Sequence, residues 1–205
     1  MLSTRTDEVV VLTRRQGIVT ARALREQGIA PAYLQRLTAR GVLTRVARGI
    51  YELADGAEGA DITAMHTLVE ACLRVPSGVV CLLSALRFHN LTTQAPRAVW
   101  MAIDPKARLP KIPYPPLRIV RFGGTARTTG VEKHLVEGQE VQVYSVAKTV
   151  ADCFKYRHKI GLDVAIEALN DAWRGRRATA DELWRAAQVD RVANVMRPYL
   201  EAVQA

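Results

Sequence analysis

Two residues that follow a predicted strand have the side chains needed for metal-dependent cleavage of nucleic acid. Asp104 and Lys106 come directly after residues 99–103, and metal-dependent nucleases use this Asp-x-Lys order to hold a metal and steady the attacking water. No second strand-borne acid precedes the pair nearby in the sequence, and Pro105 fits a loop better than a rigid strand. A nuclease or other nucleic-acid enzyme that uses Asp104 and Lys106 is therefore kept as the alternative function.

A second pair could form an acyl-enzyme. Ser145 and Lys148 have the Ser-x-x-Lys spacing of penicillin-binding proteins, but the Ser-Asp-Asn and Lys-Thr-Gly elements of those enzymes do not follow. Ser145 is predicted to be a helix N-cap instead. The phosphate-loop, dinucleotide, zinc-protease and hydrolase motifs are missing as well. We expect a protein that is not an enzyme.

The metal-binding residue types are scattered along the chain. The four histidines lack ligand spacing, and the three cysteines, Cys72, Cys81 and Cys153, include no Cys-x-x-Cys pair. The odd number of cysteines also argues against a disulfide framework, so buried free thiols are expected. No metal and no cofactor is predicted.

Arginine is concentrated near the N-terminus. Positions 14 to 48 hold eight arginines, no lysine and one acid, Glu26, which is +7 of the formal net charge of +9. A planar guanidinium binds phosphate and guanine through two hydrogen bonds, so the expected partner is double-stranded DNA. A solvated basic face is the simpler alternative. The residues expected to contact DNA are Arg14, Arg22, Tyr33, Gln35, Arg36, Arg40, Arg45 and Arg48.

Local signals predict a winged helix-turn-helix around these arginines. The first helix is predicted to run from an N-cap at Thr4 to a stop at Gly17. Thr20 caps a second helix over residues 21–27, which Gly28 closes. The third helix has Pro31 at its first position and ends at Gly41. Residues 42–46 and 50–53 then form a hairpin, the wing. In the third helix Leu34 and Leu37 share one face, which leaves the polar residues for a DNA groove.

A larger domain of mixed α/β type is predicted behind this module. Residues 54–60 are small and turn-rich, so the boundary is placed there, with domains at 1–55 and 56–205. Predicted helices begin at caps Asp61, Ser84, Ser145 and Thr179, residues 162–173 form another, and Pro198 is expected to break or start the last. Residues 79–83 are an apolar run, and strands are expected over residues 99–103, 117–122, 131–136 and 141–144. The fold class is therefore α+β with a helical C-terminal third.

The beginning of the chain does not look like a targeting segment. Asp7 and Glu8 lie within the first sixteen residues, whose only apolar run, residues 9–12, is too short for a signal peptide or a membrane span. We expect a cytoplasmic protein without a membrane partner.

Several passages resemble AbiEi-type antitoxins of type IV toxin-antitoxin and phage abortive-infection systems. These are RVARGIYEL at 45–53, VPSGVVCLLSALRFHNLTTQAP at 75–96, VYSVAKTVADCFKYRHKIGLDVAIEAL at 143–169 and VANVMRPYLEA at 192–202. The resemblance implies an N-terminal winged helix that represses its own operon by binding the promoter. It also implies a C-terminal domain that counters a co-transcribed nucleotidyltransferase-like toxin, and leaves open whether the two proteins touch.

The sequence departs from its look-alikes at the start of the third helix. Ala30, Pro31 and Ala32 stand where those proteins tend to carry polar or basic residues. Base reading would then depend on Tyr33, Gln35 and Arg36. Gln35 could pair with adenine and Arg36 with guanine.

Overall fold

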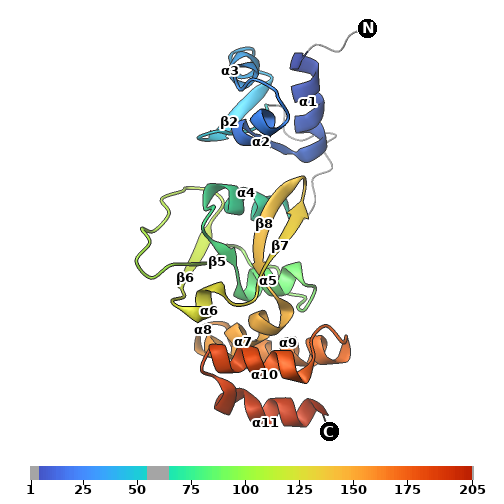
Figure 1. Cartoon of the computed structure of the whole chain (residues 1–205), viewed down its shortest axis with the longest axis vertical. Helices are drawn as coiled ribbons and strands as arrows, with labels where there is room; N and C mark the ends of the chain where they lie inside the picture. The colour runs from blue at the N-terminus through green and yellow to red at the C-terminus, as the bar shows by residue number, and fades with distance from the viewer. Residues whose placement is uncertain (1–4, 55–64, 205) are drawn as a thin grey trace. The chain divides into compact units, whose positions relative to one another are not determined.

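A computed structural model describes residues 5–54 and 65–204 of the chain (Figure 1). The chain divides into two compact units, which are described separately. Unit 1 comprises residues 1–74 with 135–140, and unit 2 comprises residues 75–134 with 141–205. No helix in the described ranges is long and apolar enough to cross a bilayer. The predicted boundary within residues 54–60 falls largely outside the described ranges and stays a prediction.

Unit 1 contains three helices, a small sheet and a fourth helix. Its elements in chain order are α1 (Arg5–Gln16), β1 (Ile18–Thr20), α2 (Ala21–Glu26), α3 (Ala32–Ala39), β2 (Leu43–Ala47), β3 (Ile50–Leu53) and α4 (His66–Arg74). The strands pair antiparallel in the order β1-β3-β2. This is the predicted winged helix-turn-helix, with β1 as a strand that was not predicted.

Short-range interactions explain the helix ends of this module. The Thr20 hydroxyl accepts a hydrogen bond from the Ala23 amide and caps α2, and Gly28 takes the positive φ of 71° that follows the helix. Pro31 is the N-cap of α3 rather than its first residue. The predicted cap Thr4 lies outside the described residues, as does Asp61 before α4.

Unit 2 contains most of a five-stranded mixed sheet. Its strands are β4 (Val79–Val80), β5 (Val99–Ile103), β6 (Leu117–Arg121), β7 (Val131–Val136) and β8 (Gln139–Tyr144), although the tip between β7 and β8 belongs to unit 1. The strand order is β6-β5-β4-β8-β7. β4 pairs antiparallel with β5 and parallel with β8, while β5 and β6 pair parallel. The predicted α+β class is confirmed.

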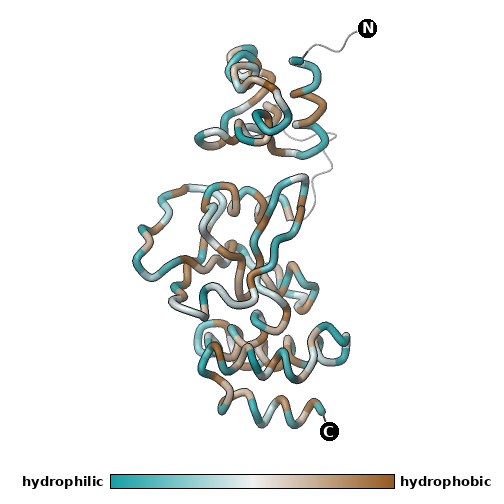
Figure 2. Tube along the Cα trace, viewed as in Figure 1, coloured by the Kyte–Doolittle hydropathy of each residue, from teal (hydrophilic) through white to brown (hydrophobic). Residues whose placement is uncertain are grey.

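Helices surround the core of unit 2. They are α5 (Leu82–Phe88), α6 (Thr125–Thr128), α7 (Val146–Lys155), α8 (Arg157–Ile160), α9 (Leu162–Arg174), α10 (Ala180–Val189) and α11 (Ala193–Gln204). Helix α7 packs against α5, α9, α10 and α11, and eight of its ten residues are buried. Along α9, α10 and α11 hydrophobic and hydrophilic residues alternate, as an amphipathic helix requires (Figure 2).

Two predicted helix signals in unit 2 are wrong. Cys81, not Ser84, is the N-cap of α5, and the Ser84 hydroxyl inside the helix accepts a hydrogen bond of 2.9 Å from the Trp100 amide. Pro198 neither breaks nor starts a helix but lies inside α11. Proline removes one helical hydrogen bond, and the buried Met196 and Leu200 anchor the helix on both sides of it.

The other caps of unit 2 follow the predictions. The Ser145 hydroxyl accepts a hydrogen bond from the Lys148 amide, and Thr179 with Glu182 forms a complete capping box. All three cysteines are buried and free. The predicted helix up to about residue 158 is divided into α7 and α8, and the run at residues 79–83 is divided between β4 and α5.

Candidate nucleic-acid interface

Helix α3 has one face in the core of unit 1 and the other in solvent. Leu34 and Leu37 are buried with Val9, Val19 and Leu24. The predicted reading residues Gln35, Arg36 and Arg40 are exposed, and Tyr33 is half-buried. The Arg36 guanidinium lies 5.4 Å from the centre of the Tyr33 ring, a cation–π distance that restricts where the guanidinium points.

The wing carries two exposed arginines. Arg45 is on β2, where the pairing with β3 shifts register between Arg45 and Ala47, and its Nε donates a hydrogen bond of 3.2 Å to the Ala47 carbonyl. Arg48 and Gly49 form the turn, and Gly49 has a φ of 77°, which only glycine adopts at little cost. Both guanidinium groups are therefore held on a tight hairpin.

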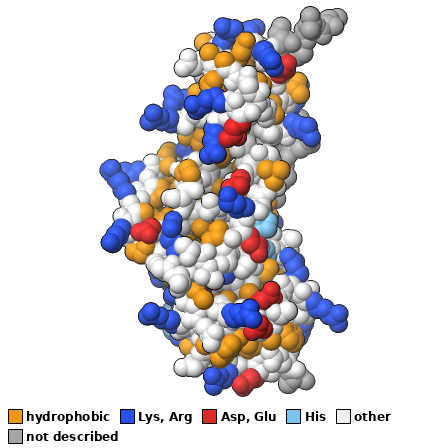
Figure 3. All heavy atoms as spheres, viewed as in Figure 1, with side chains coloured by type: hydrophobic (Ala, Val, Ile, Leu, Met, Phe, Trp, Pro, Cys, Tyr) orange, Lys and Arg blue, Asp and Glu red, His pale blue; other side chains and the backbone are white. Residues whose placement is uncertain are grey.

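The remaining predicted contacts lie on α1 and α2. Arg14 is exposed in the last turn of α1. Arg22 is exposed on α2, where its Nε lies 2.8 Å from a Glu26 carboxylate oxygen, so part of its charge is already balanced. Lys and Arg side chains outnumber acids over these elements in Figure 3. All the predicted contact residues lie in unit 1, and their contact with DNA stays a prediction.

Sequence reasoning missed the support of the wing by α4. Arg74 at the end of α4 donates a hydrogen bond of 2.8 Å from Nη2 to the Val46 carbonyl on β2. Glu70 holds the same guanidinium at 2.7 Å, and both side chains are largely buried. The i, i+4 spacing of these two charges in an apolar helix was the available signal. The contact positions the backbone that carries Arg45.

The Asp104 and Lys106 pair forms a turn. An Asp104 carboxylate oxygen accepts a hydrogen bond of 2.8 Å from the amide of Lys106. The Arg121 guanidinium donates to the carbonyls of Asp104, Pro105 and Ala107 at 3.0, 2.6 and 3.0 Å. The observed contacts of this pair are those of a braced loop, and they do not favour the nuclease alternative.

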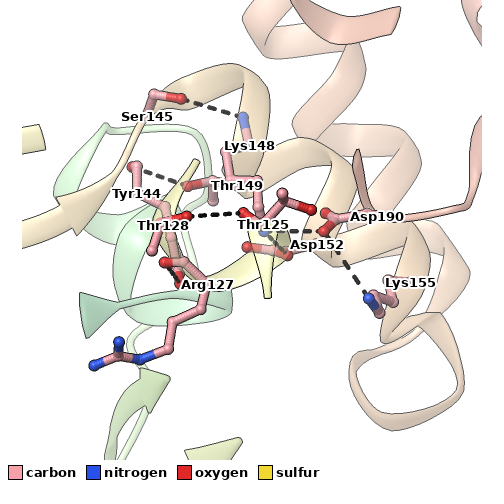
Figure 4. A network of polar contacts seen from close by, with 10 residues as sticks. All are labelled: Thr125, Arg127, Thr128, Tyr144, Ser145, Lys148, Thr149, Asp152, Lys155 and Asp190. Atoms are coloured by element: carbon pink, nitrogen blue, oxygen red, sulfur yellow. Dashed lines mark hydrogen bonds and ion pairs between the residues drawn. The ribbon is translucent and has the colours of Figure 1, made fainter. Parts of the chain in front are cut away.

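Lys148 has a different role from the lysine of an acyl-enzyme (Figure 4). It is 1% exposed, and its Nζ is bonded to a carboxylate oxygen of Asp152 and lies 3.1 Å from Asp190. The same Nζ lies 4.6 Å and 4.5 Å from the ring centres of Phe122 and Tyr144. The ammonium therefore faces carboxylates and rings, while the Ser145 hydroxyl serves as the helix cap.

The charges of this buried group are unequal in number. Burial raises the pKa of Asp152 well above its ordinary value, the Lys148 charge opposes this, and Asp190 raises the pKa further. Sequence reasoning missed this network, although Lys148 and Asp152 are four residues apart in a strongly apolar helix.

The segment that carries most of the exposed arginines of unit 1 matches a known protein family. Residues 10–54 match the family described as transcriptional regulator, AbiEi antitoxin. The match runs from α1 to the end of the wing and confirms the predicted resemblance over this segment. It supports a regulator and antitoxin role, which agrees with a protein that is not an enzyme.

Comparisons over the whole chain concern the fold. No curated protein matches the sequence. The crystal structure of the RV2827C protein from Mycobacterium tuberculosis is similar, with a TM-score of 0.59 and 14% identity over 99% of this chain and 81% of that chain. At this identity the similarity shows that the two proteins share a fold.

Proposed function

We propose that this chain is a DNA-binding autorepressor and the antitoxin of a type IV toxin-antitoxin system. It would bind its own promoter and counter a co-transcribed nucleotidyltransferase-like toxin. The observation that carries the proposal is the row of exposed polar residues on α3, in a segment that matches a regulator family. The domain behind it, with the predicted bounds 56–205, would carry the antitoxic activity.

The module would divide its contacts between phosphates and bases. Arg45 and Arg48 on the wing, with Arg14, Arg22 and Arg40, would bind phosphates and position α3 in the major groove. Gln35 would then read adenine and Arg36 guanine. The Tyr33 ring beside Arg36 limits its rotamers, which lowers the entropy lost when the guanidinium meets a base.

The first test is binding of the purified chain to its own upstream promoter and to scrambled DNA of equal length. We expect promoter preference that Arg36→Ala reduces by about 1–3 kcal/mol, the value of one bidentate base contact. Arg185→Ala is the matched control, because this exposed arginine is on α10 and already pairs with Asp181. If Arg36→Ala keeps the full promoter preference, Arg36 does not read a base. If the wild type prefers neither DNA, the autorepressor proposal is wrong.

The antitoxin half of the proposal needs a separate test. Co-expression of the chain with the co-transcribed toxin is expected to restore growth that the toxin alone arrests. Arg36→Ala should still protect when expressed from a foreign promoter, because base reading is assigned to unit 1. Growth arrest in the presence of the wild-type chain would contradict the antitoxin role.

A further inference from the structure

A long connection in unit 2 joins two neighbouring parallel strands without a helix. Strands β5 and β6 pair parallel, and residues 104–116 lead from the end of β5 to the start of β6. Parallel neighbours are usually joined through a helix, and a connection of this length without regular structure is usually functional. In Figure 1 this segment extends away from the sheet in yellow-green. We call residues 104–116 the proline loop, because they include five prolines.

Contacts at both ends fix the proline loop to the sheet. At its beginning, the Arg121 guanidinium donates hydrogen bonds to three backbone carbonyls of the loop. At its end, the Val99 amide donates a hydrogen bond of 2.9 Å to the Pro116 carbonyl. Each proline also holds its own φ at about −65°, so the loop has few conformations to lose when it binds a ligand. The surface of the loop is therefore largely formed in advance.

The proline loop and the strands beside it form a second concentration of positive charge. Positions 97 to 121 hold six basic residues and one acid, Asp104, which gives a net charge of +5. The Asp104 carboxylate is already used within the loop, since it accepts a hydrogen bond from the Lys106 amide. Lys and Arg side chains outnumber acids over this part of Figure 3. The basic residues are all exposed, and they are Arg97, Lys106, Arg108, Lys111, Arg118 and Arg121.

Most of these cations are free to bind an anion. Within the described ranges, Arg97 and the three basic side chains of the loop form no ion pair and no side-chain hydrogen bond. The Arg118 guanidinium lies 6.0 Å from the centre of the ring of Trp100, its neighbour across the β5–β6 pair, and this ring restricts where the charge points. An anionic ligand would therefore meet several unpaired cations on one braced loop.

The proline loop also exposes apolar side chains. Tyr114 is 55% exposed and Leu109 is 54% exposed, and in the described part of the chain no other tyrosine is exposed. A ring among cations offers the two contacts that a single strand of nucleic acid needs, because cations bind phosphates and a ring stacks on an unpaired base. In a duplex the bases stack on one another, so the ring would have no base face to contact.

We propose that the proline loop, with Arg97 and Arg118, binds single-stranded nucleic acid at a site separate from the duplex site of unit 1. The three basic side chains of the loop would bind phosphates, and Tyr114 would stack on a base. An acidic peptide would also meet the cations, but it offers no flat face to the exposed ring. A membrane surface usually binds an amphipathic helix, and the loop contains none.

Binding of the purified full-length chain to labelled strands of about twenty nucleotides, one of RNA and one of DNA, tests this by fluorescence anisotropy. Tyr114→Ala should weaken binding about tenfold, the value of one stacked base, whereas Tyr114→Phe keeps the ring and should bind like the wild type. Arg108→Ala with Lys111→Ala should reduce the slope of log affinity against log salt by about 1.4, which is about 0.7 for each phosphate. Because these side chains are exposed, the melting temperature should stay unchanged.

The matched control lies in the apolar groove of unit 2, which has a volume of about 910 Å³ between α9 and α11. Arg174 and Arg176 are exposed there beside the half-buried rings of Trp173 and Tyr199. Arg174→Ala with Arg176→Ala therefore removes the same charge from another surface with rings, and it should bind both strands like the wild type. If this variant loses affinity and the loop variants keep it, the strands bind in the groove and the proposal is wrong.

The remaining outcomes separate the proline loop from other surfaces and from the proposed function. Binding of either strand that the loop variants weaken supports the proposal, and the strand that binds more tightly identifies the ligand as RNA or DNA. If only Arg45→Ala with Arg48→Ala weakens strand binding, the strands bind unit 1 and the proposal is wrong. It is also wrong if the wild type binds phosphatidylserine vesicles and neither strand. Promoter preference is measured separately, so its absence would contradict the autorepressor proposal and not this one.

Discussion

At the scale of single residues, the most costly feature of the chain is the buried charge of Lys148. Removing an ammonium and two carboxylates from water is unfavourable, and their mutual attraction offsets that cost only in good geometry. Here Asp152, Asp190 and two aromatic rings surround the ammonium. Three of the buried carboxylate oxygens, on Asp152 and Asp190, have no hydrogen-bond partner among the described residues, so these carboxylates depend on the Lys148 charge.

Lys148→Met is expected to lower the free energy of unfolding by about 3–5 kcal/mol at pH 7, because it removes the buried cation from Asp152 and leaves Asp190 with only the more distant Lys155. Lys155→Met is the control on the same helix, since the Lys155 side chain is 34% exposed and lies 4.0 Å from Asp190. It should cost less than about 1 kcal/mol. Urea denaturation measures the free energy of unfolding of both variants. Equal losses would mean that the buried Lys148 contributes no more to stability than the partly exposed Lys155.

His89 makes stability depend on pH. Burial lowers the pKa of its imidazole, and its Nε2 lies 2.7 Å from the Tyr144 carbonyl oxygen, which can only accept, so Nε2 carries the hydrogen. A lowered pKa in the folded state means that the unfolded state binds the proton first. Stability is therefore present above the unfolded pKa of about 6.5 and is lost as pH falls through the lower folded pKa.

The measurement is urea denaturation of the wild type and His89→Gln between pH 7.5 and 5. The advantage of the wild type should shrink as pH falls below about 6.5, because glutamine does not titrate. If the difference in free energy of unfolding between the wild type and His89→Gln stays constant over this range, protonation of His89 does not cause the loss of stability in acid.

At the scale of elements, helix ends were easier to predict than helix interruptions. The Thr20, Ser145 and Thr179 caps form because each hydroxyl meets an amide within three residues. Pro198 behaves differently, since α11 continues through it against local preference. Packing of Met196 and Leu200 in the core of unit 2 compensates for the missing hydrogen bond.

Pro198→Ala is therefore expected to stabilise the protein by about 1–3 kcal/mol, because alanine restores a helical amide donor at an exposed position. Thermal unfolding measures this as a higher melting temperature. Pro113→Ala serves as the control, because Pro113 is exposed outside any helix and its loss should slightly destabilise. A lower melting temperature for Pro198→Ala would mean that the proline shape is needed for packing.

At the scale of the whole molecule, the concentrated positive charge near the N-terminus and the apolar groove lie in different units. The eight arginines between positions 14 and 48 belong to unit 1, while the groove with its apolar lining belongs to unit 2. Electrostatic attraction to DNA is long-ranged and independent of sequence, so it depends on how many phosphates are neutralised.

Salt dependence tests the electrostatic part. A double variant, Arg45→Ala with Arg48→Ala, should weaken promoter and scrambled DNA equally and reduce the slope of log affinity against log salt by about 2. Arg36→Ala should mainly reduce the preference between the two DNAs. A double variant with an unchanged slope would place the wing away from the phosphates.

The sequence by itself determined the features that depend on neighbours along the chain. The capping hydroxyls, the glycines with positive φ, the helix periodicity and the hairpin of the wing all act within a few residues, so their signals survive without the fold. The concentration of arginine, and hence the expectation of a DNA surface, is also a property of the sequence alone.

Tertiary structure decided what depends on distant residues. The strand order β6-β5-β4-β8-β7 pairs segments that lie far apart in the chain, and Asp190 reaches Lys148 only because α10 packs on α7. The groove forms where α9 and α11 leave apolar side chains uncovered. Such contacts reflect the total burial of apolar surface, to which many remote residues contribute together, so no local pattern could have specified them.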